Sequence, residues 1–337
     1  ALAAVGSAYA LMIFLTSIII GLSMGSSALF SICFGQKNMD KLRNCIFAAF
    51  LIIGAATVVL NILAFLFIDP ILIFLKTPSE IYDMMRSYVF IIFTGLCATF
   101  FYNFFASLLR SIGNSFIPPV FLAVSAVLNI VLDLLFVVKF NWSVEGAAIA
   151  TVISQYVSGI GITFYTLVYF PELRIRKSNM YIRKNVISEL SQFSFLTCLQ
   201  QSVMNFGILM VQGLVNSFGT AIMAAFAAGV KIDSFAYMPV QDFGNAFSTF
   251  IAQNFGAKKT ERIQKGIKSA VITSAVFCIF ISFVVFILAK PLMLIFIDES
   301  EMEIISAGVH YLRIEGLFYI GIGILFLFYG FYRVVKI

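Results

Sequence analysis

The sequence predicts an all-α membrane protein built from two similar halves, and three observations support this prediction. The 337 residues are 61% hydrophobic and only 11% charged, whereas a soluble domain carries about 25% charged residues. The apolar residues gather in nine continuous runs, each near the ~20 residues that a helix needs to cross a bilayer. Landmarks of the first runs recur about 221 residues later in the chain.

The apolar runs are continuous and lack the alternation of β-barrel strands, so helices are expected. The predicted spans lie near 7–34, 44–68, 84–109, 117–139, 146–170, 191–216, 221–254, 266–289 and 307–332. The five cysteines stand singly and only one histidine is present, so no metal centre or thiol chemistry is predicted. The chain also lacks GxSxG, HExxH and glycine-rich phosphate motifs. We therefore predict that it is not an enzyme and needs no cofactor.

The basic residues alternate between the two sides of the predicted membrane. The basic-rich connections contain Lys37, Lys41, Arg43, Arg110, Arg174, Arg176, Lys177, Arg183, Lys184, Lys258, Lys259, Arg262, Lys265, Lys268, Arg333 and Lys336. The alternate connections contain Lys76, Lys139 and Lys290. The positive-inside rule then predicts a multi-pass protein of the plasma (inner) membrane with cytoplasmic basic loops. Because these residues act as orientation signals, nucleic acid is not an expected partner.

An internal repeat divides the chain. The matched pairs are Phe34 with Phe255, Gly35 with Gly256, Pro70 with Pro291, Tyr88 with Tyr311 and Arg110 with Arg333, at offsets of 221 to 223. These matches predict an amino-terminal lobe at 1–170, a cytoplasmic linker at 171–188 and a carboxy-terminal lobe at 189–337. The offset also predicts a twelve-span bundle of two parallel six-helix repeats. About nine spans would be present here, with one missing before residue 1 and two after residue 337.

Polar residues inside hydrocarbon are costly and usually functional, so they mark candidate sites. Asn129 and Asp133 are four residues apart within the fourth predicted span and share one helix face. A carboxylate beside an amide in this position can bind Na⁺ or take up a proton. The structural alternative is an acid near the outer end of the helix that is held by structural contacts.

The second half contains further intramembrane polar residues. The substrate-cavity candidates are Gln201, Asn205, Gln241, Asp242 and Glu315. Gln201 and Asn205 share a helix face, and hydrogen bonding between helices explains them equally well. Met238–Pro239 predicts a kinked or broken helix that would line a cavity. Lys231 and Asp233 are interpreted as a structural ion pair, and no metal site is predicted apart from Na⁺ at Asp133.

Several segments resemble one transporter family. They are residues 25–36, 108–115, 129–133, 144–151, 230–245 and 252–257, and Tyr311-Leu-Arg-Ile-Glu-Gly316. Together they resemble the multidrug and toxic compound extrusion (MATE) family over essentially the whole chain, from the second to the tenth of twelve spans. The resemblance implies that Asn129 and Asp133 match the amino-lobe cation or proton site. An acid on the seventh span, which some members use, is replaced here by Gln200 and Gln201.

The resemblance also implies a function. We expect a secondary active antiporter that exports cationic small molecules in exchange for Na⁺ or H⁺ by alternating access, with its substrate site between the lobes. Its partners would be this substrate and the lipid bilayer, and the protein would be monomeric. A lipid-linked oligosaccharide flippase would need a basic cavity, whereas the intramembrane charges here lean acidic. A non-transporting receptor or scaffold would not need buried acids in both halves, and uptake remains an alternative to export.

Overall fold

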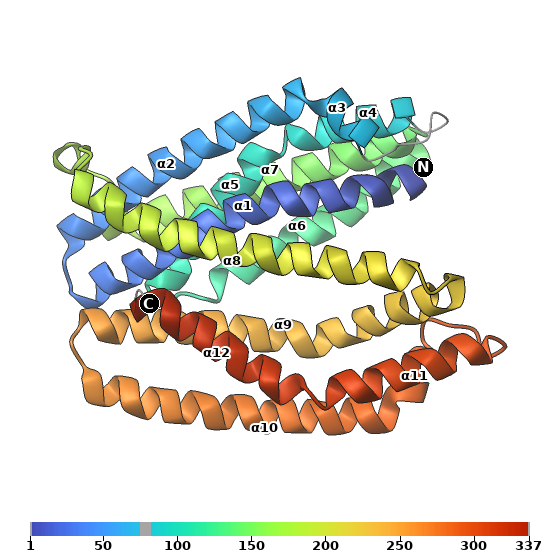
Figure 1. Cartoon of the computed structure of the whole chain (residues 1–337). Helices are drawn as coiled ribbons and strands as arrows, with labels where there is room; N and C mark the ends of the chain where they lie inside the picture. Colours follow the sequence, from blue (N-terminus) through green and yellow to red (C-terminus); the bar gives the residue numbers. More distant parts are fainter. Residues whose placement is uncertain (1, 75–81, 336–337) are drawn as a thin grey trace. The chain divides into compact units, whose positions relative to one another are not determined.

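The computed structural model describes residues 2–74 and 82–335, and regular structure within them is helical throughout. Lys76 and Lys336, two of the residues used to predict orientation, lie outside the described residues. The α-helices in chain order are α1 (Leu2–Gly35), α2 (Met39–Leu66), α3 (Ile68–Phe74), α4 (Tyr82–Phe93), α5 (Leu96–Ser111), α6 (Ile117–Asp133), α7 (Ser143–Tyr169), α8 (Lys184–Asn216), α9 (Thr220–Gly256), α10 (Thr260–Met293), α11 (Met302–Gly316) and α12 (Tyr319–Val335) (Figure 1).

The predicted number of spans is confirmed by the lengths of these helices. Within the described residues, seven helices are long and apolar enough to cross a membrane. Two bent pairs, α4 with α5 and α11 with α12, raise the number to nine if each pair forms one span. The bends are 40° and 50° respectively. They fall at equivalent places in the two repeats, because Gly95 and Phe318 differ by the same 223 residues as the matched tyrosines.

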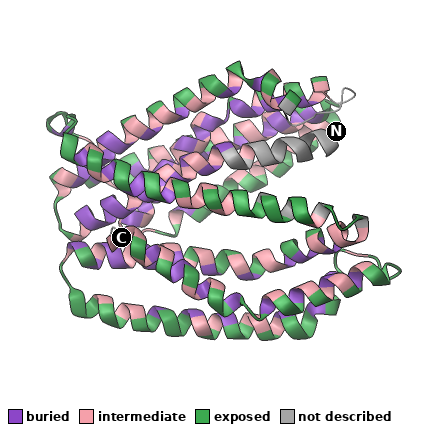
Figure 2. Cartoon of the chain, viewed as in Figure 1, coloured by how far each residue is buried: buried purple, intermediate pink, exposed green. Residues whose placement is uncertain are grey.

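The chain forms two compact units, Ala1–Ser202 and Val203–Ile337. In the first unit, α1 packs against α2, α4 and α5, while α7 packs against α4, α5 and α6. In the second unit, α9 contacts α10, α11 and α12. The division therefore falls inside α8 rather than in the predicted linker. Many positions on these helices are exposed (green in Figure 2), and a large share of the exposed residues have large apolar side chains, as expected of helices that meet lipid.

The turns after α1 and α9 show the internal repeat in three dimensions. Lys37 and Lys258 occupy equivalent positions, and both have a φ of 56° in the left-handed region. The backbone N–H of the next residue then donates to a carbonyl five residues earlier, at 3.2 Å after α1 and 2.9 Å after α9. This tight reversal satisfies carbonyls at the helix end. The repeat therefore extends from sequence landmarks to backbone conformation.

The connection between the repeats is fastened to the start of α2. Asn44 is buried and donates from Nδ2 to the carbonyl oxygens of Asn179 at 3.0 Å and Tyr181 at 2.6 Å. The Arg43 Nε donates to the carbonyl of Glu172 at 2.9 Å. Because α8 already begins at Lys184, the predicted linker of 171–188 is too long at its carboxyl end. Helix formation continues there because no proline or glycine interrupts 184–188.

Helix α9 is continuous through Pro239, so of the kink or break predicted at Met238–Pro239, the break does not occur. Proline removes one backbone N–H from the helical ladder and leaves the carbonyl of Phe235 without its usual donor. Long membrane helices tolerate this loss because neighbouring groups compensate for the missing hydrogen bond. Packing of α9 against three other helices of its unit accounts for the continuity.

Helices α1 and α8 approach closely where α1 carries glycine. A Cβ atom on Gly25 would lie 2.6 Å from the carbonyl oxygen of Phe193 and would also collide with the Ser194 backbone. The Ser26 and Ser194 hydroxyl oxygens are 3.0 Å apart at this crossing. Small residues thus allow backbone contact and a hydrogen bond between helices, as is typical of membrane interfaces.

We expect Gly25→Ala to lower the free energy of unfolding by about 1–3 kcal/mol, because the added methyl group must displace backbone. Denaturant unfolding of the purified protein in detergent measures this change. The matched control is Gly213→Ala on α8, where a Cβ atom would meet nothing within 4 Å. Equal stability of the two variants would contradict close packing at Gly25.

Candidate functional site

The second unit contains a large pocket of about 730 Å³. Its lining is mostly apolar and aromatic, and two acids, Asp233 of α9 and Glu315 of α11, contribute to it. The carboxyl half of α8 closes one side through Met204, Gly207 and Ile208. Such a pocket, apolar with a few convergent polar groups, is the usual form of a small-molecule site.

The two carboxylates are close enough to influence each other, and each has a phenol beside it. Tyr311 lies next to Glu315, and Tyr319 lies next to Asp233. However, Asp233 Oδ1 and Glu315 Oε2 are buried and form no hydrogen bond of regular geometry with the described residues, although the Tyr319 and Tyr311 phenols lie beside the two carboxylates. Unpaired buried carboxylate oxygens are costly. The pocket is therefore well suited to a cation or proton that would satisfy them.

Helix geometry explains why these acids meet. Glu315 is the penultimate residue of α11, directly before the 50° bend to α12. The Ser282 hydroxyl of α10 donates to the freed carbonyl of Gly316 at 2.6 Å and so stabilises the bend. Asp233 and Tyr237 are four residues apart on α9 and therefore share its face toward the pocket.

Aromatic rings form much of the pocket wall. Phe226 packs against Tyr311 with ring centroids 5.4 Å apart, and Tyr237 packs against Phe326 at 5.2 Å. The Tyr237 hydroxyl also lies 3.4 Å from the Met204 sulfur. Ring faces attract organic cations and stack on flat aromatic molecules. This wall can hold a molecule that carries both a positive charge and a ring.

Lys231 and Asp233 do not form the ion pair that the sequence suggested. Two residues apart on a helix, their side chains leave in different directions. The Lys231 Nζ lies 5.6 Å from the ring centroid of Phe296, while Asp233 lines the pocket. The structure therefore places Asp233 in the candidate site rather than in the predicted ion pair with Lys231.

Most of the other predicted cavity residues lie outside this pocket. Gln201 and Asn205 are half-buried on α8, Gln241 is half-buried on α9, and Asp242 is exposed. The lining of the pocket includes none of these four described residues. Of the predicted cavity residues, only Glu315 belongs to it.

Four tyrosines at the pocket were not predicted as site residues. Tyr237, Tyr311 and Tyr329 line it, and Tyr319 lies beside Asp233. The four-residue spacing of Tyr311 and Glu315, and of Asp233 and Tyr237, was the available signal in the sequence.

Asp133 lies at a separate place, in the first unit. Its Oδ1 atom is buried and has no hydrogen-bond partner among the described residues. Asn129, one turn earlier, donates from Nδ2 to the Thr151 hydroxyl of α7 at 3.4 Å. Asp133 ends α6, and the next six residues, Leu134–Lys139, form a π-helical segment. Single-turn π-helical segments often occur at functional sites, and an orphaned carboxylate oxygen here fits Na⁺ or a proton.

The side chains at the pocket and at Asp133 limit which ions or molecules could bind there. Among the described residues, no group of three or more His, Cys, Asp or Glu side chains is arranged to hold a metal ion. The two carboxylates of the pocket and the single carboxylate of Asp133 suit a proton, a monovalent ion or an organic cation. The weak demands of Na⁺ for oxygen ligands are compatible with both places.

The chain matches known proteins over nearly its whole length. The family model described as MatE matches residues 1–135 and 194–337. The Bacillus subtilis (strain 168) protein "Probable multidrug resistance protein YpnP" is 27% identical over 318 residues, which cover 94% of this chain and 70% of that protein. The Thermotoga maritima "Probable multidrug resistance protein NorM" is 26% identical over 305 residues, which cover 89% of this chain and 65% of that protein. The chain thus spans about two thirds of these relatives.

Solved structures show the same fold. A crystal structure of the Vibrio cholerae MATE transporter VcmN in the bent form matches with a TM-score of 0.90 and 24% identity, covering 99% of this chain and 75% of that one. A transporter of the MOP superfamily from Pyrococcus furiosus matches with a TM-score of 0.90 and 19% identity, covering 99% and 76%. At these identities the matches establish the helical architecture alone.

Proposed function

Because the chain belongs to the MatE family, we propose that it is a secondary active antiporter that exports cationic, aromatic small molecules in exchange for Na⁺ or H⁺. The observation that carries this proposal is the pocket of the second unit, where Asp233 and Glu315 face an aromatic wall. Two relatives are named as multidrug resistance proteins, which supports export. In this role the acids bind the positive charge and the rings bind the flat part of the substrate.

Coupling requires that one ion and the substrate favour different states of the transporter. A ligand shifts a conformational equilibrium only by its differential affinity for the two states. We assign ion binding to Asp133, because its carboxylate oxygen is buried without a partner and Asn129 lies one turn away. Filling of this place favours the state that releases substrate outside, and the ion gradient then drives export.

The acidic pocket argues against a flippase for lipid-linked oligosaccharides. Such a substrate carries phosphate, so its site would need cations. The acids Asp233 and Glu315 line the pocket of the second unit, and its lining contains no Lys or Arg among the described residues. A carboxylate pair would repel a pyrophosphate group.

The proposed coupling predicts that efflux stops when one particular ion gradient is removed. In cells that produce the protein from its natural gene, ethidium efflux is followed by fluorescence while the Na⁺ and proton gradients are collapsed separately. We expect a loss of about tenfold or more with one ionophore and little change with the other, because only one ion drives the cycle. Efflux that survives loss of both gradients would refute antiport, and absence of efflux from well-expressed protein would refute drug export.

A further inference from the structure

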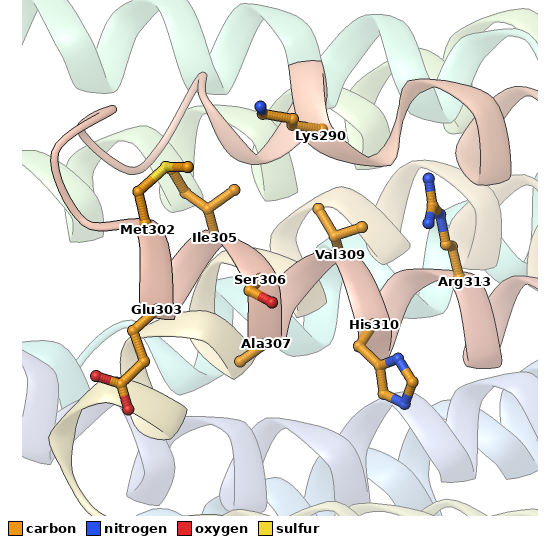
Figure 3. A pocket seen from close by; sticks show the side chains of 9 residues that line it. All are labelled: Lys290, Met302, Glu303, Ile305, Ser306, Ala307, Val309, His310 and Arg313. Carbon is orange, nitrogen blue, oxygen red and sulfur yellow. The ribbon is translucent and has the colours of Figure 1, made fainter.

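A second cavity lies at the surface of the second unit, between the end of α10 and α11. This groove has a volume of about 760 Å³. Lys290 comes from α10, whereas Glu303, Ser306, His310 and Arg313 come from α11 (Figure 3). All five side chains are exposed. The groove is separate from the acidic pocket, because Arg313 and Glu315 leave α11 on different faces.

The cations of the groove lack acidic partners. No carboxylate of the described residues lies within 4.0 Å of the Lys290 or Arg313 nitrogens. Arg313 instead lies over the Phe286 ring, whose centroid is 5.2 Å from the guanidinium carbon. Among the described residues that line the groove, Glu303 is the only acid. The groove therefore offers positive charge that the protein itself does not neutralise.

The equivalent position in the amino-terminal repeat carries different charges. By the repeat offsets, Asp69 is equivalent to Lys290, and Arg86 is equivalent to Val309. Asp69 and Arg86 form a bidentate pair, with nitrogen–oxygen distances of 2.7 and 3.3 Å. The Arg86 guanidinium holds the pKa of the Asp69 carboxyl below its usual value. The first repeat is thus neutral at this place, whereas in the second repeat a lysine replaces the acid.

The repeat also indicates that this face meets lipid. Phe90 is equivalent to Arg313 and packs against Phe65 at 5.0 Å, just as Arg313 packs against the equivalent Phe286. Phe90 is 50% exposed, so the helices that follow it in the first repeat, α6 and α7, leave half of its side chain uncovered. Next to the groove, α10 presents exposed apolar side chains such as Phe283 and Ile287. Acyl chains can cover this apolar surface.

We infer that the groove between α10 and α11 binds the phosphodiester headgroup of an anionic phospholipid. A guanidinium and an ammonium group match phosphate oxygens by charge-assisted hydrogen bonds. The Ser306 hydroxyl and the His310 ring supply further donors at the same groove. Long basic side chains on a lipid-facing helix are otherwise costly, and an anionic headgroup removes that cost.

Native mass spectrometry of the purified protein, titrated with phosphatidylglycerol in neutral detergent, tests this inference. Wild type should retain one phosphatidylglycerol more tightly than phosphatidylcholine. Lys290→Gln/Arg313→Gln should weaken this binding about tenfold, because two cations near a headgroup are removed. The control Lys139→Gln/Lys265→Gln removes two exposed lysines elsewhere and should leave it unchanged.

Two further arms keep the test decisive. Lys290→Asp places at this position the acid found at the equivalent Asp69 and reverses its charge; we expect this variant to melt like wild type and to lose the lipid. Glycerophosphoglycerol, the deacylated form of phosphatidylglycerol, carries the same phosphodiester without acyl chains and should not displace the lipid at equal concentration. Unchanged phosphatidylglycerol binding in the folded variants would overturn the inference, as would displacement by glycerophosphoglycerol.

Discussion

Glu315→Gln is expected to reduce export of ethidium about tenfold or more. The substitution keeps the shape of the side chain but removes the charge that faces Asp233 inside an apolar pocket. Differences in binding of 1–3 kcal/mol between states correspond to roughly 5- to 150-fold. The measurement is ethidium efflux from cells that produce equal amounts of each protein, together with ethidium binding to purified protein by fluorescence anisotropy.

Two companion variants make the Glu315 prediction specific. Asp233→Asn should cause a similar loss, and the double variant should be less damaging than the two single effects combined, because interacting groups are not additive. Asp242→Asn is the matched control, since this exposed acid on α9 lies outside the pocket lining. A strong effect of Asp242→Asn together with normal export by Glu315→Gln would show that the substrate binds outside the pocket.

The main features of the fold could be predicted from the sequence because the bilayer imposes a simple rule. A membrane span must satisfy its backbone hydrogen bonds internally, so long apolar runs become helices. The predicted 117–139 segment illustrates both the success and its limit. It is helical over its whole length, but it changes from α to π geometry after Asp133. That change depends on local packing against α7 and has no periodic signature.

The candidate site was harder to predict because it depends on which helix faces meet. Glu315 was identified because an acid inside a span is costly. Proximity in sequence predicts Lys231 as the partner of Asp233, but residues two apart on a helix point in different directions, and Asp233 lines the pocket instead. Polarity, and for Gln201 also the four-residue spacing to Asn205, predicts Gln201 and Gln241 as cavity residues, but the pocket lining does not include them. Residue type thus locates the functional spans, whereas tertiary contacts decide which members share a cavity.

Asp133→Asn is expected to uncouple export from the ion gradient. The substitution replaces the carboxylate, whose Oδ1 atom is buried without a hydrogen-bond partner among the described residues, with a neutral amide. The amide cannot take up a proton and binds Na⁺ more weakly. Net ethidium efflux should fall about tenfold, a coupling change of the usual size. The remaining efflux should no longer respond to collapse of either gradient, because substrate binding in the second unit is unchanged.

The decisive comparison for Asp133 uses reconstituted vesicles with an imposed Na⁺ or proton gradient. Asn129→Ala should weaken coupling less than Asp133→Asn, because the amide already donates to Thr151 and contributes only one neutral oxygen. Glu145→Gln serves as the control, since this exposed acid begins α7 near the same end of the span. Full gradient response in folded Asp133→Asn would remove Asp133 from coupling. Ion binding would then fall to Asp233 and Glu315, which would have to bind ion and substrate alternately in one pocket.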